Sequence, residues 1–166
     1  AHPDHLWGAV DEFDTPAYPN AKYHISAAEW DFWFATDVFS KLPEDRHSFA
    51  AGAQRILKIL EPVVSRFRPG EEVAPGVAAI DTSGHTPGHV SFEVRRGSES
   101  AVVLGDALTH AVLSFQRPQW PGGFDQDPDK AVATRRTILD KFATEKSRII
   151  GYHLSGGGAG RVERDG

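Results

Sequence analysis

The pattern of hydrophobic and polar residues predicts several helices in the first third of the chain. The expected elements are a strand over residues 22–25 and helices over residues 6–13, 27–36 and 45–60. Ser26, followed three residues later by Glu29, has the sequence of a capping box, which predicts where the second helix begins. On that helix, we expect Trp30 and Trp33 to pack in the core.

The pattern changes to short hydrophobic runs after Pro69-Gly70, which is typical of strands. The expected strands cover residues 77–81, 90–95, 101–104 and 148–151. A turn at residues 96–98 predicts a hairpin between the second and third of them. A proline-rich loop over residues 115–127 ends at Asp127-Pro128, the sequence of a helix start, and this helix should reach about residue 142. Helices and strands together predict an α/β fold.

The composition narrows the function classes. The chain has 166 residues, 40% hydrophobic and 25% charged, which predicts one globular domain over residues 1–166. A net charge of −5 argues against nucleic-acid binding, and no hydrophobic run is long enough to span a membrane. The absence of cysteine excludes thiolate ligands and nucleophiles, and cytoplasmic and periplasmic locations stay equally compatible. Because the chain lacks methionine and begins at Ala1, we expect that translation did not start here and that the sequence is a fragment, a processed chain or the ordered part of a longer one.

Histidine and aspartate residues gather in four short clusters. These are His2-Pro3-Asp4-His5, Gly84-His85-Thr86-Pro87-Gly88-His89, Leu104-Gly105-Asp106 and Gly151-Tyr152-His153. Each cluster alone also fits an ordinary polar turn, a helix cap or a histidine at a strand end. Neutral imidazole and carboxylate are common ligands of zinc, iron and manganese. Because the clusters lie next to predicted strands, together they predict a metal site that the fold gathers in one cleft.

The order and spacing of these clusters resemble the metallo-β-lactamase superfamily over nearly the whole chain. The first resembles the end of its His-x-His-x-Asp-His motif, and the second its Gly-His-Thr-Pro-Gly-His segment. Asp106 resembles its bridging aspartate and His153 its last histidine ligand. The resemblance implies an α/β sandwich with αββα layers, of which this chain is mainly the C-terminal part. The pattern looks most like that of methyl parathion hydrolase and lactonase-like members.

The resemblance also implies a dinuclear centre with two divalent ions, zinc first, with manganese or iron as alternatives. The implied metal ligands are His2, Asp4, His5, His89, Asp106 and His153. His2 and His89 would bind the first ion, together with a histidine that the motif has just before Ala1, and Asp106 would bridge both ions. That upstream histidine is not in this sequence.

Asp4, His5 and His153 would bind the second ion according to the same resemblance. Asp4 would also be the catalytic residue that takes up or returns a proton. His85, although it lies in the motif, is expected to be a structural residue that contacts and orients a metal ligand, and not to bind metal itself.

The implied activity is hydrolysis, in which a hydroxide bound by two metals attacks an ester, lactone or phosphotriester. Two alternatives stay open: an iron-dependent oxidoreductase on the same fold, and a non-catalytic fragment with an incomplete site. A nuclease, also known on this fold, is disfavoured by the acidic balance. We expect a small-molecule substrate, no nucleic acid and no membrane. Either a homo-oligomer or a missing N-terminal segment would complete the fold.

Aromatic residues near the proline-rich loop are the candidates for substrate contacts. Phe115 and Trp120 flank this loop, and His110 follows Asp106 by four residues and offers a polar contact. Core packing is the alternative for each aromatic residue. Arg135 and Arg136 are expected on a solvated helix face.

Overall fold

The chain divides into two compact units, Ala1–Phe67 and Arg68–Gly166, called here the N-terminal and the C-terminal unit. The computed structural model describes residues 3–164, with side chains from His5 onward. His2 and the side chain of Asp4, both predicted ligands, therefore lie outside the described part. None of the described helices combines the length and the apolar character needed to cross a membrane.

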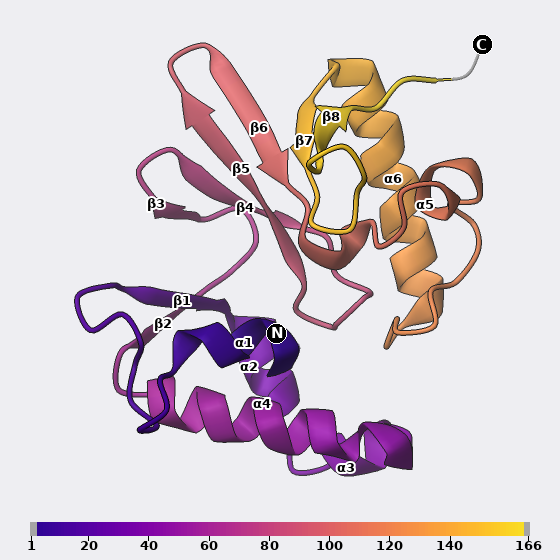
Figure 1. The fold of residues 1–166 in the computed structure, drawn as a ribbon. Coiled ribbons are helices and arrows are strands. Elements are labelled where there is room, and N and C mark those ends of the chain that lie inside the picture. Colours follow the sequence, from indigo (N-terminus) through magenta and orange to yellow (C-terminus); the bar gives the residue numbers. More distant parts are fainter. Residues whose placement is uncertain (1–2, 165–166) are drawn as a thin grey trace. The chain divides into compact units, whose positions relative to one another are not determined.

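The N-terminal unit is mainly helical (Figure 1). Its elements are α1 Pro3–Leu6, a 3-10 turn at Trp7–Ala9, β1 Tyr23–Ser26, α2 Ala27–Trp33, α3 Val38–Lys41, a 3-10 turn at Glu44–Arg46, α4 His47–Leu60 and β2 Val64–Phe67. β1 and β2 pair in parallel. The expected strand and the three expected helices are found, but the first helical segment covers residues 3–9 instead of residues 6–13, and the second helix ends at Trp33 instead of residue 36.

Trp30 and Trp33 lie in the core of this unit, as predicted, with Trp33 completely buried. The predicted capping box is wrong. Ser26 makes no side-chain cap, and its buried Oγ finds no hydrogen-bond partner among the described residues. The Glu29 carboxylate instead accepts a hydrogen bond from Trp33 Nε1 at 2.9 Å, because one helical turn brings both side chains to the same buried face.

The C-terminal unit is built on one sheet with the strand order β3-β4-β5-β6-β7-β8. The strands are β3 Glu72–Ala74, β4 Val77–Asp81, β5 Val90–Arg96, β6 Glu99–Val103, β7 Arg148–Ile150 and β8 Ala159–Arg161. The helical segments are a 3-10 turn at Gly105–Ala107, α5 Leu113–Gln116 and α6 Pro128–Glu145. β5 and β6 form the predicted hairpin, and β6 and β7 pair in parallel.

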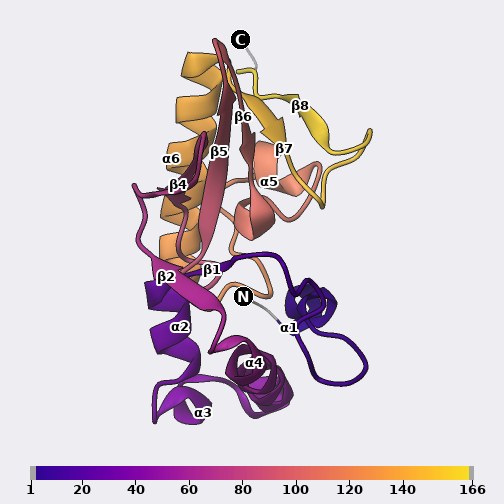
Figure 2. The ribbon, with the colours of Figure 1, turned by 90° about the vertical axis from the view of Figure 1, so that its left-hand side faces the viewer.

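The long helix α6 covers one face of this sheet, as the edge-on view shows (Figure 2). Ile138 and Phe142 of α6 pack in one core cluster with Val102 of β6 and Ile149 of β7. The helix begins as predicted, because the Asp127 side chain accepts a hydrogen bond from the Lys130 N–H at 3.1 Å.

The parallel pairing of β6 and β7 decides where the candidate ligands lie. The carboxyl ends of parallel neighbours meet at the same edge of a sheet. Asp106 follows β6 and His153 follows β7, so the two residues lie together although 47 positions separate them.

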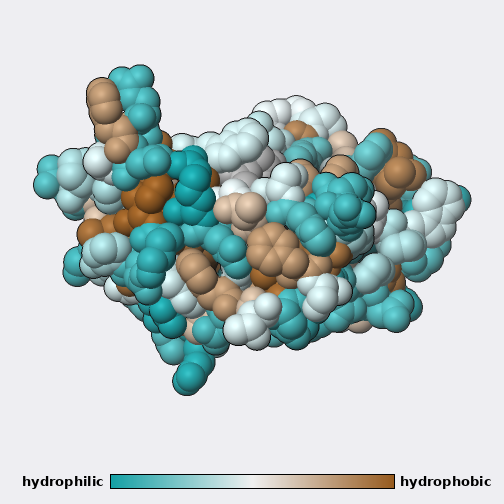
Figure 3. Space-filling model, turned by 90° about the horizontal axis from the view of Figure 1, so that it is seen from below, coloured by the Kyte–Doolittle hydropathy of each residue, from teal (hydrophilic) through white to brown (hydrophobic). Residues whose placement is uncertain are grey.

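Some large hydrophobic side chains stay exposed in both units. Trp7 and Phe13 of the N-terminal unit and Val94 and Ile150 of the C-terminal unit are examples. On the surface seen in Figure 3, hydrophobic residues occur as separate patches between hydrophilic ones.

Candidate metal centre

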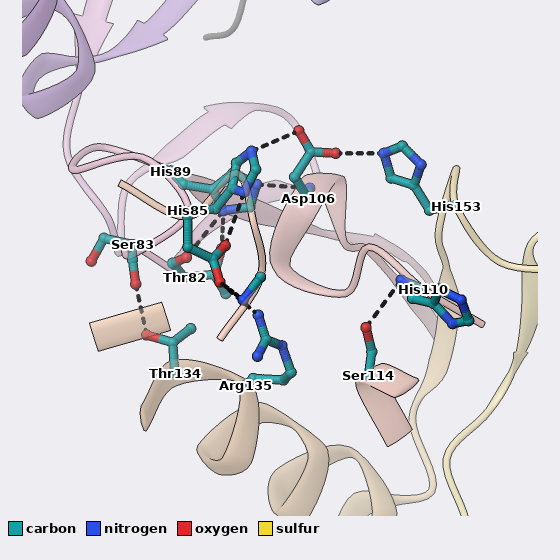
Figure 4. A network of polar contacts seen from close by, with 12 residues as sticks. Thr82, Ser83, His85, His89, Asp106, His110, Ser114, Thr134, Arg135 and His153 are labelled. Atoms are coloured by element: carbon teal, nitrogen blue, oxygen red, sulfur yellow. Dashed lines mark hydrogen bonds and ion pairs between the residues drawn. The ribbon is translucent and has the colours of Figure 1, made fainter. Parts of the chain in front are cut away.

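The carboxylate of Asp106 lies between two histidines in the C-terminal unit (Figure 4). Its Oδ2 is 3.3 Å from Nε2 of His85, and its Oδ1 is 3.0 Å from Nε2 of His153. Asp106 and His85 are buried, whereas the His153 side chain keeps 35% of its surface exposed. Each oxygen of one carboxylate therefore faces a different imidazole, and one of these imidazoles opens to solvent.

These distances fit residues that share metal ions. Two ligands at about 2.0–2.1 Å from a tetrahedral zinc lie about 3.3 Å from each other. Both nitrogen–oxygen pairs at Asp106 are close to this separation. A carboxylate with one imidazole at each oxygen is also the arrangement in which it can bridge two cations. The described residues at this edge of the sheet therefore fit divalent metal ions by donor type and by spacing.

His85 is held from behind by a second carboxylate. Its Nδ1 lies 3.1 Å from Oδ1 of Asp125, which directs Nε2 at Asp106. Burial disfavours the charged imidazole, but the hydrogen bonds to Asp106 and Asp125 outweigh burial and raise the pKa of His85. A histidine whose Nδ1–H is donated to a carboxylate keeps its Nε2 lone pair for a metal, which is the usual arrangement of a ligating histidine.

His89, predicted as a ligand, has different surroundings. Its Nε2 accepts a hydrogen bond from the backbone N–H of Asp106 at 2.9 Å. The lone pair that a metal would need is therefore engaged by the main chain. Nε2 of His85 therefore faces the carboxylate of Asp106, whereas Nε2 of His89 faces the main chain of Asp106.

A directed chain of hydrogen bonds fixes the tautomer of His89. Because Nε2 accepts a hydrogen bond, Nδ1 carries the proton and donates a hydrogen bond to Thr82 Oγ1, which lies 2.8 Å away. Thr82 Oγ1 can then donate to Ser91 Oγ at 3.0 Å, and Ser91 Oγ donates to the Leu104 carbonyl, also at 3.0 Å. Burial lowers the pKa of His89 to about 4, which agrees with a neutral ring.

Two glycines make these contacts possible. Gly105 has a φ of +56°, and a Cβ there would lie 2.7 Å from His89 Nε2. Gly84 has a φ of +135°, and a Cβ there would lie 2.4 Å from the backbone nitrogen of Ala131 on α6. A side chain at Gly84 would push the loop that carries His85 away from α6, and a side chain at Gly105 would separate His89 from Asp106.

The remaining predicted ligands belong to the N-terminal unit. His5 lies on α1 and is exposed. Asp4 lies on the same helix, and the structure describes its backbone alone. The structure thus brings together Asp106, His85 and His153, and the roles of the residues before Leu6 stay predictions.

The predicted substrate contacts differ in exposure. Trp120 is 54% exposed, whereas Phe115 is partly buried and packs on the core cluster of the C-terminal unit. The His110 ring is engaged locally, because its Nδ1 accepts the N–H groups of Val112 and Leu113 at the start of α5, both at 3.1 Å.

Sequence reasoning missed Asp125 and misplaced Arg135. Arg135 was expected on a solvated helix face, but it is only 3% exposed, and its NH2 group lies 3.1 Å from Oδ2 of Asp125. Arg136 is exposed, as predicted. Asp125 precedes the helix cap Asp127 by two residues in a polar loop, and that sequence carries no signal of burial.

Comparisons with known proteins identify the family and the fold of the chain. The family model described as "Metallo-beta-lactamase superfamily" matches residues 1–153. Two solved structures share 30% sequence identity with the chain: the hydrolase AbOPH in the beta lactamase superfamily, with a TM-score of 0.88, and AidC, a dizinc quorum-quenching lactonase in complex with a product, with a TM-score of 0.89. Each similarity covers 99% of this chain and 58% of the other protein.

A probable metal-dependent hydrolase from Staphylococcus aureus has 20% identity and a TM-score of 0.76 over 99% of this chain and 56% of that protein, and this likeness concerns the fold alone. A search of curated protein sequences gives no significant match. The predicted α/β fold is confirmed by these similarities, and the chain spans 58% of the length of AbOPH and AidC.

Proposed function

Because the chain belongs to the metallo-β-lactamase superfamily, we propose that it is the ligand-bearing part of a metal-dependent hydrolase of esters, lactones or phosphotriesters. The family match spans both compact units, which supports the further proposal that they make one domain. The substrate is a small molecule, and the cofactor is a pair of divalent ions, with zinc as the first choice.

The observation that carries this proposal is the position of the Asp106 carboxylate. One oxygen faces His85 at 3.3 Å and the other faces His153 at 3.0 Å, which is the donor arrangement of a bridge between two cations. The described residues near this carboxylate offer imidazole and carboxylate donors and no thiolate, since the chain has no cysteine.

We assign the ligand roles with one exchange relative to the sequence prediction. His85 takes the ligand position in place of His89, because Nε2 of His85 faces the carboxylate and Nε2 of His89 accepts a main-chain hydrogen bond. His2, Asp4 and His5 complete the proposed set, and Asp4 also carries the proton. The bound ions would supply Lewis acidity and water of lowered pKa for attack on a carbonyl or phosphoryl centre.

Among the candidate substrates, we propose lactones first. The support is AidC, which is described as a dizinc lactonase and is 30% identical to the chain. Trp120, half-exposed on the loop after α5, is the proposed apolar contact for the substrate, with Phe115 and His110 as weaker candidates.

The test combines metal content with activity on the full-length protein. Elemental analysis without added chelator should give about two zinc, manganese or iron ions per chain, and N-hexanoyl homoserine lactone should be opened in a chelator-sensitive reaction. Asp106→Asn should lose metal and lower kcat/KM by at least about 100-fold. His24→Asn is the matched control, because His24 is exposed on β1.

Two results would contradict the proposal. Protein that binds no metal even after reconstitution would exclude a metal-dependent hydrolase. Protein that binds metal but opens no lactone, ester or phosphotriester would remove the hydrolytic assignment, and iron as the only bound metal would then favour the oxidoreductase alternative.

A further inference from the structure

Arg135 is a buried cation that does not belong to the proposed ligand set. It lies on α6 with 3% exposure and contacts groups that precede the helix in the sequence. Its NH2 lies 3.1 Å from Oδ2 of Asp125. Its NH1 donates to the carbonyl oxygens of Trp120 at 2.9 Å and Pro118 at 3.2 Å. One guanidinium therefore binds a buried carboxylate and the backbone of the loop before it.

Asp125 connects Arg135 to His85, because one of its carboxylate oxygens contacts Arg135 and the other contacts His85. Its Oδ1 lies 3.1 Å from Nδ1 of His85, while its Oδ2 accepts both Arg135 and the N–H of Gly122, the latter at 2.8 Å. Burial opposes the charged carboxylate, but the hydrogen bonds from His85, Gly122 and Arg135 outweigh burial and lower the pKa of Asp125. These three contacts fix the directions of both carboxylate oxygens of Asp125.

Burial of Arg135 costs free energy of folding, and core packing alone does not explain why an arginine is kept there. Its Nε is buried and has no hydrogen-bond partner among the described residues. An unsatisfied buried donor destabilises a protein, and replacing a buried ion pair by apolar residues of similar volume is often neutral or stabilising. The three contacts made by NH1 and NH2 all end on the loop segment from Pro118 to Asp125.

We propose that Arg135 is a positioning residue of the metal centre, acting through Asp125 on the ring of His85. By fixing Asp125, it keeps the proton of His85 on Nδ1 and keeps Nε2 directed at Asp106. This inference rests on the proposed function, because it takes His85 as a metal ligand. The same guanidinium donates a hydrogen bond to the carbonyl of Trp120. One side chain therefore positions both the proposed substrate loop and the proposed metal ligand His85.

An arginine is needed for this task because two acceptor sets must be reached at once. NH2 serves the carboxylate and NH1 serves the two carbonyls, whereas the single ammonium of lysine has no fork with which to reach both sets. Arg135→Lys therefore keeps the charge and removes the geometry. Arg136→Lys is the matched control, since Arg136 follows Arg135 on the same helix and is exposed.

The experiment uses the full-length protein in metal-free and zinc-loaded forms. In metal-free protein, the Nδ1 proton of His85 should give a slowly exchanging NMR signal that Arg135→Lys broadens or removes and Arg136→Lys leaves unchanged. In chelator competition, Arg135→Lys should raise the Kd for zinc about tenfold. This is the lower end of the loss of metal affinity seen when residues that hydrogen-bond to metal ligands are replaced. Asp125→Asn should raise the Kd at least as much, and the double variant should add nothing further.

The outcomes separate this inference from the proposed function. A folded Arg135→Lys protein with an unchanged His85 signal and unchanged zinc affinity would overturn the inference, as would additive effects in the double variant. If Arg135→Lys does not fold, Asp125→Asn decides, and unchanged zinc affinity in that variant overturns it. Wild-type protein that binds no zinc refutes the proposed function, and the NMR comparison in metal-free protein still tests whether Arg135 orients His85.

Discussion

Nε2 of His89 lies 2.9 Å from the backbone nitrogen of Asp106 and accepts its N–H. The main chain of Asp106 is therefore fixed by one histidine of the Gly-His-Thr-Pro-Gly-His segment, while its side chain faces the other, His85. The two histidines are four residues apart, but one serves the backbone of Asp106 and the other faces its carboxylate.

This difference predicts separate outcomes for the two histidine variants. His85→Asn should weaken zinc binding by about 10- to 100-fold or more, because it removes a proposed ligand. His89→Asn should mainly lower the free energy of unfolding, by about 1–3 kcal/mol, because the Asp106 N–H loses its buried acceptor. Chelator competition and urea unfolding measure the two effects. A larger loss of zinc affinity in His89→Asn than in His85→Asn would restore the original assignment of roles.

Alanine at Gly84 should be far more harmful than alanine at Gly97, although both glycines have positive φ. A Cβ at Gly84 would lie 2.4 Å from the Ala131 nitrogen, and backbone cannot easily give way, so we expect a loss of roughly 3 kcal/mol or more. A Cβ at Gly97 meets nothing within 4 Å, so only the left-handed backbone is strained, at roughly 1–2 kcal/mol. Equal unfolding free energies for the two variants would contradict the packing of this loop on α6.

The buried, neutral His89 predicts a stability loss at acid pH in metal-depleted protein. Its pKa is about 4 in the folded state and about 6.5 in the unfolded state. Between these values the unfolded chain binds a proton that the folded chain does not, so stability falls as the pH drops from about 6.5 to about 4. The total loss is about 3 kcal/mol, at 1.36 kcal/mol for each pKa unit.

The raised pKa of His85 acts in the opposite direction and is present in both proteins of a matched comparison. The unfolding free energy of wild type minus that of His89→Asn should therefore shrink as the pH falls from 7 to 4. A difference that stays constant over this range would show that His89 does not titrate as an isolated buried imidazole.

Asp127→Ala removes the helix cap and should destabilise the protein by about 1 kcal/mol, because the Lys130 N–H loses its acceptor. Asp129→Ala provides a control in the same helical turn, where only the interaction with the helix dipole is lost, about 0.3–1 kcal/mol. Urea unfolding of both variants measures the difference. A cap variant as stable as wild type would mean that the side-chain hydrogen bond contributes nothing in solution.

The sequence predicted most elements of the fold because their signals are local. β4 matches its expected bounds, and the hairpin of β5 and β6 and the capped start of α6 follow from a turn and an Asp-Pro pair. β2 and β3 were missed, because they have four and three residues and carry charged side chains. Strands this short depend on their neighbours more than on their own sequence.

The site shows where local signals end. Asp106 and His153 were predicted as ligands from a motif, and the parallel pairing of β6 and β7 brings them together. The distinction between His85 and His89 could not be read, because a loop has no period that assigns a direction to each side chain. Arg135 was misplaced for a similar reason: burial of an arginine depends on a partner, here Asp125, which lies ten positions earlier in an irregular segment.

The parallel pairing of β6 with β7 also orders events during translation. Asp106 is synthesised before α6 and β7, whereas His153 follows both. A nascent chain can therefore form the hairpin and place His85 beside Asp106 while the second imidazole is still unmade. The Asp106 carboxylate meets His153 only after the crossover helix α6 has returned the chain to β6, so this contact is a late event in the biogenesis of the protein.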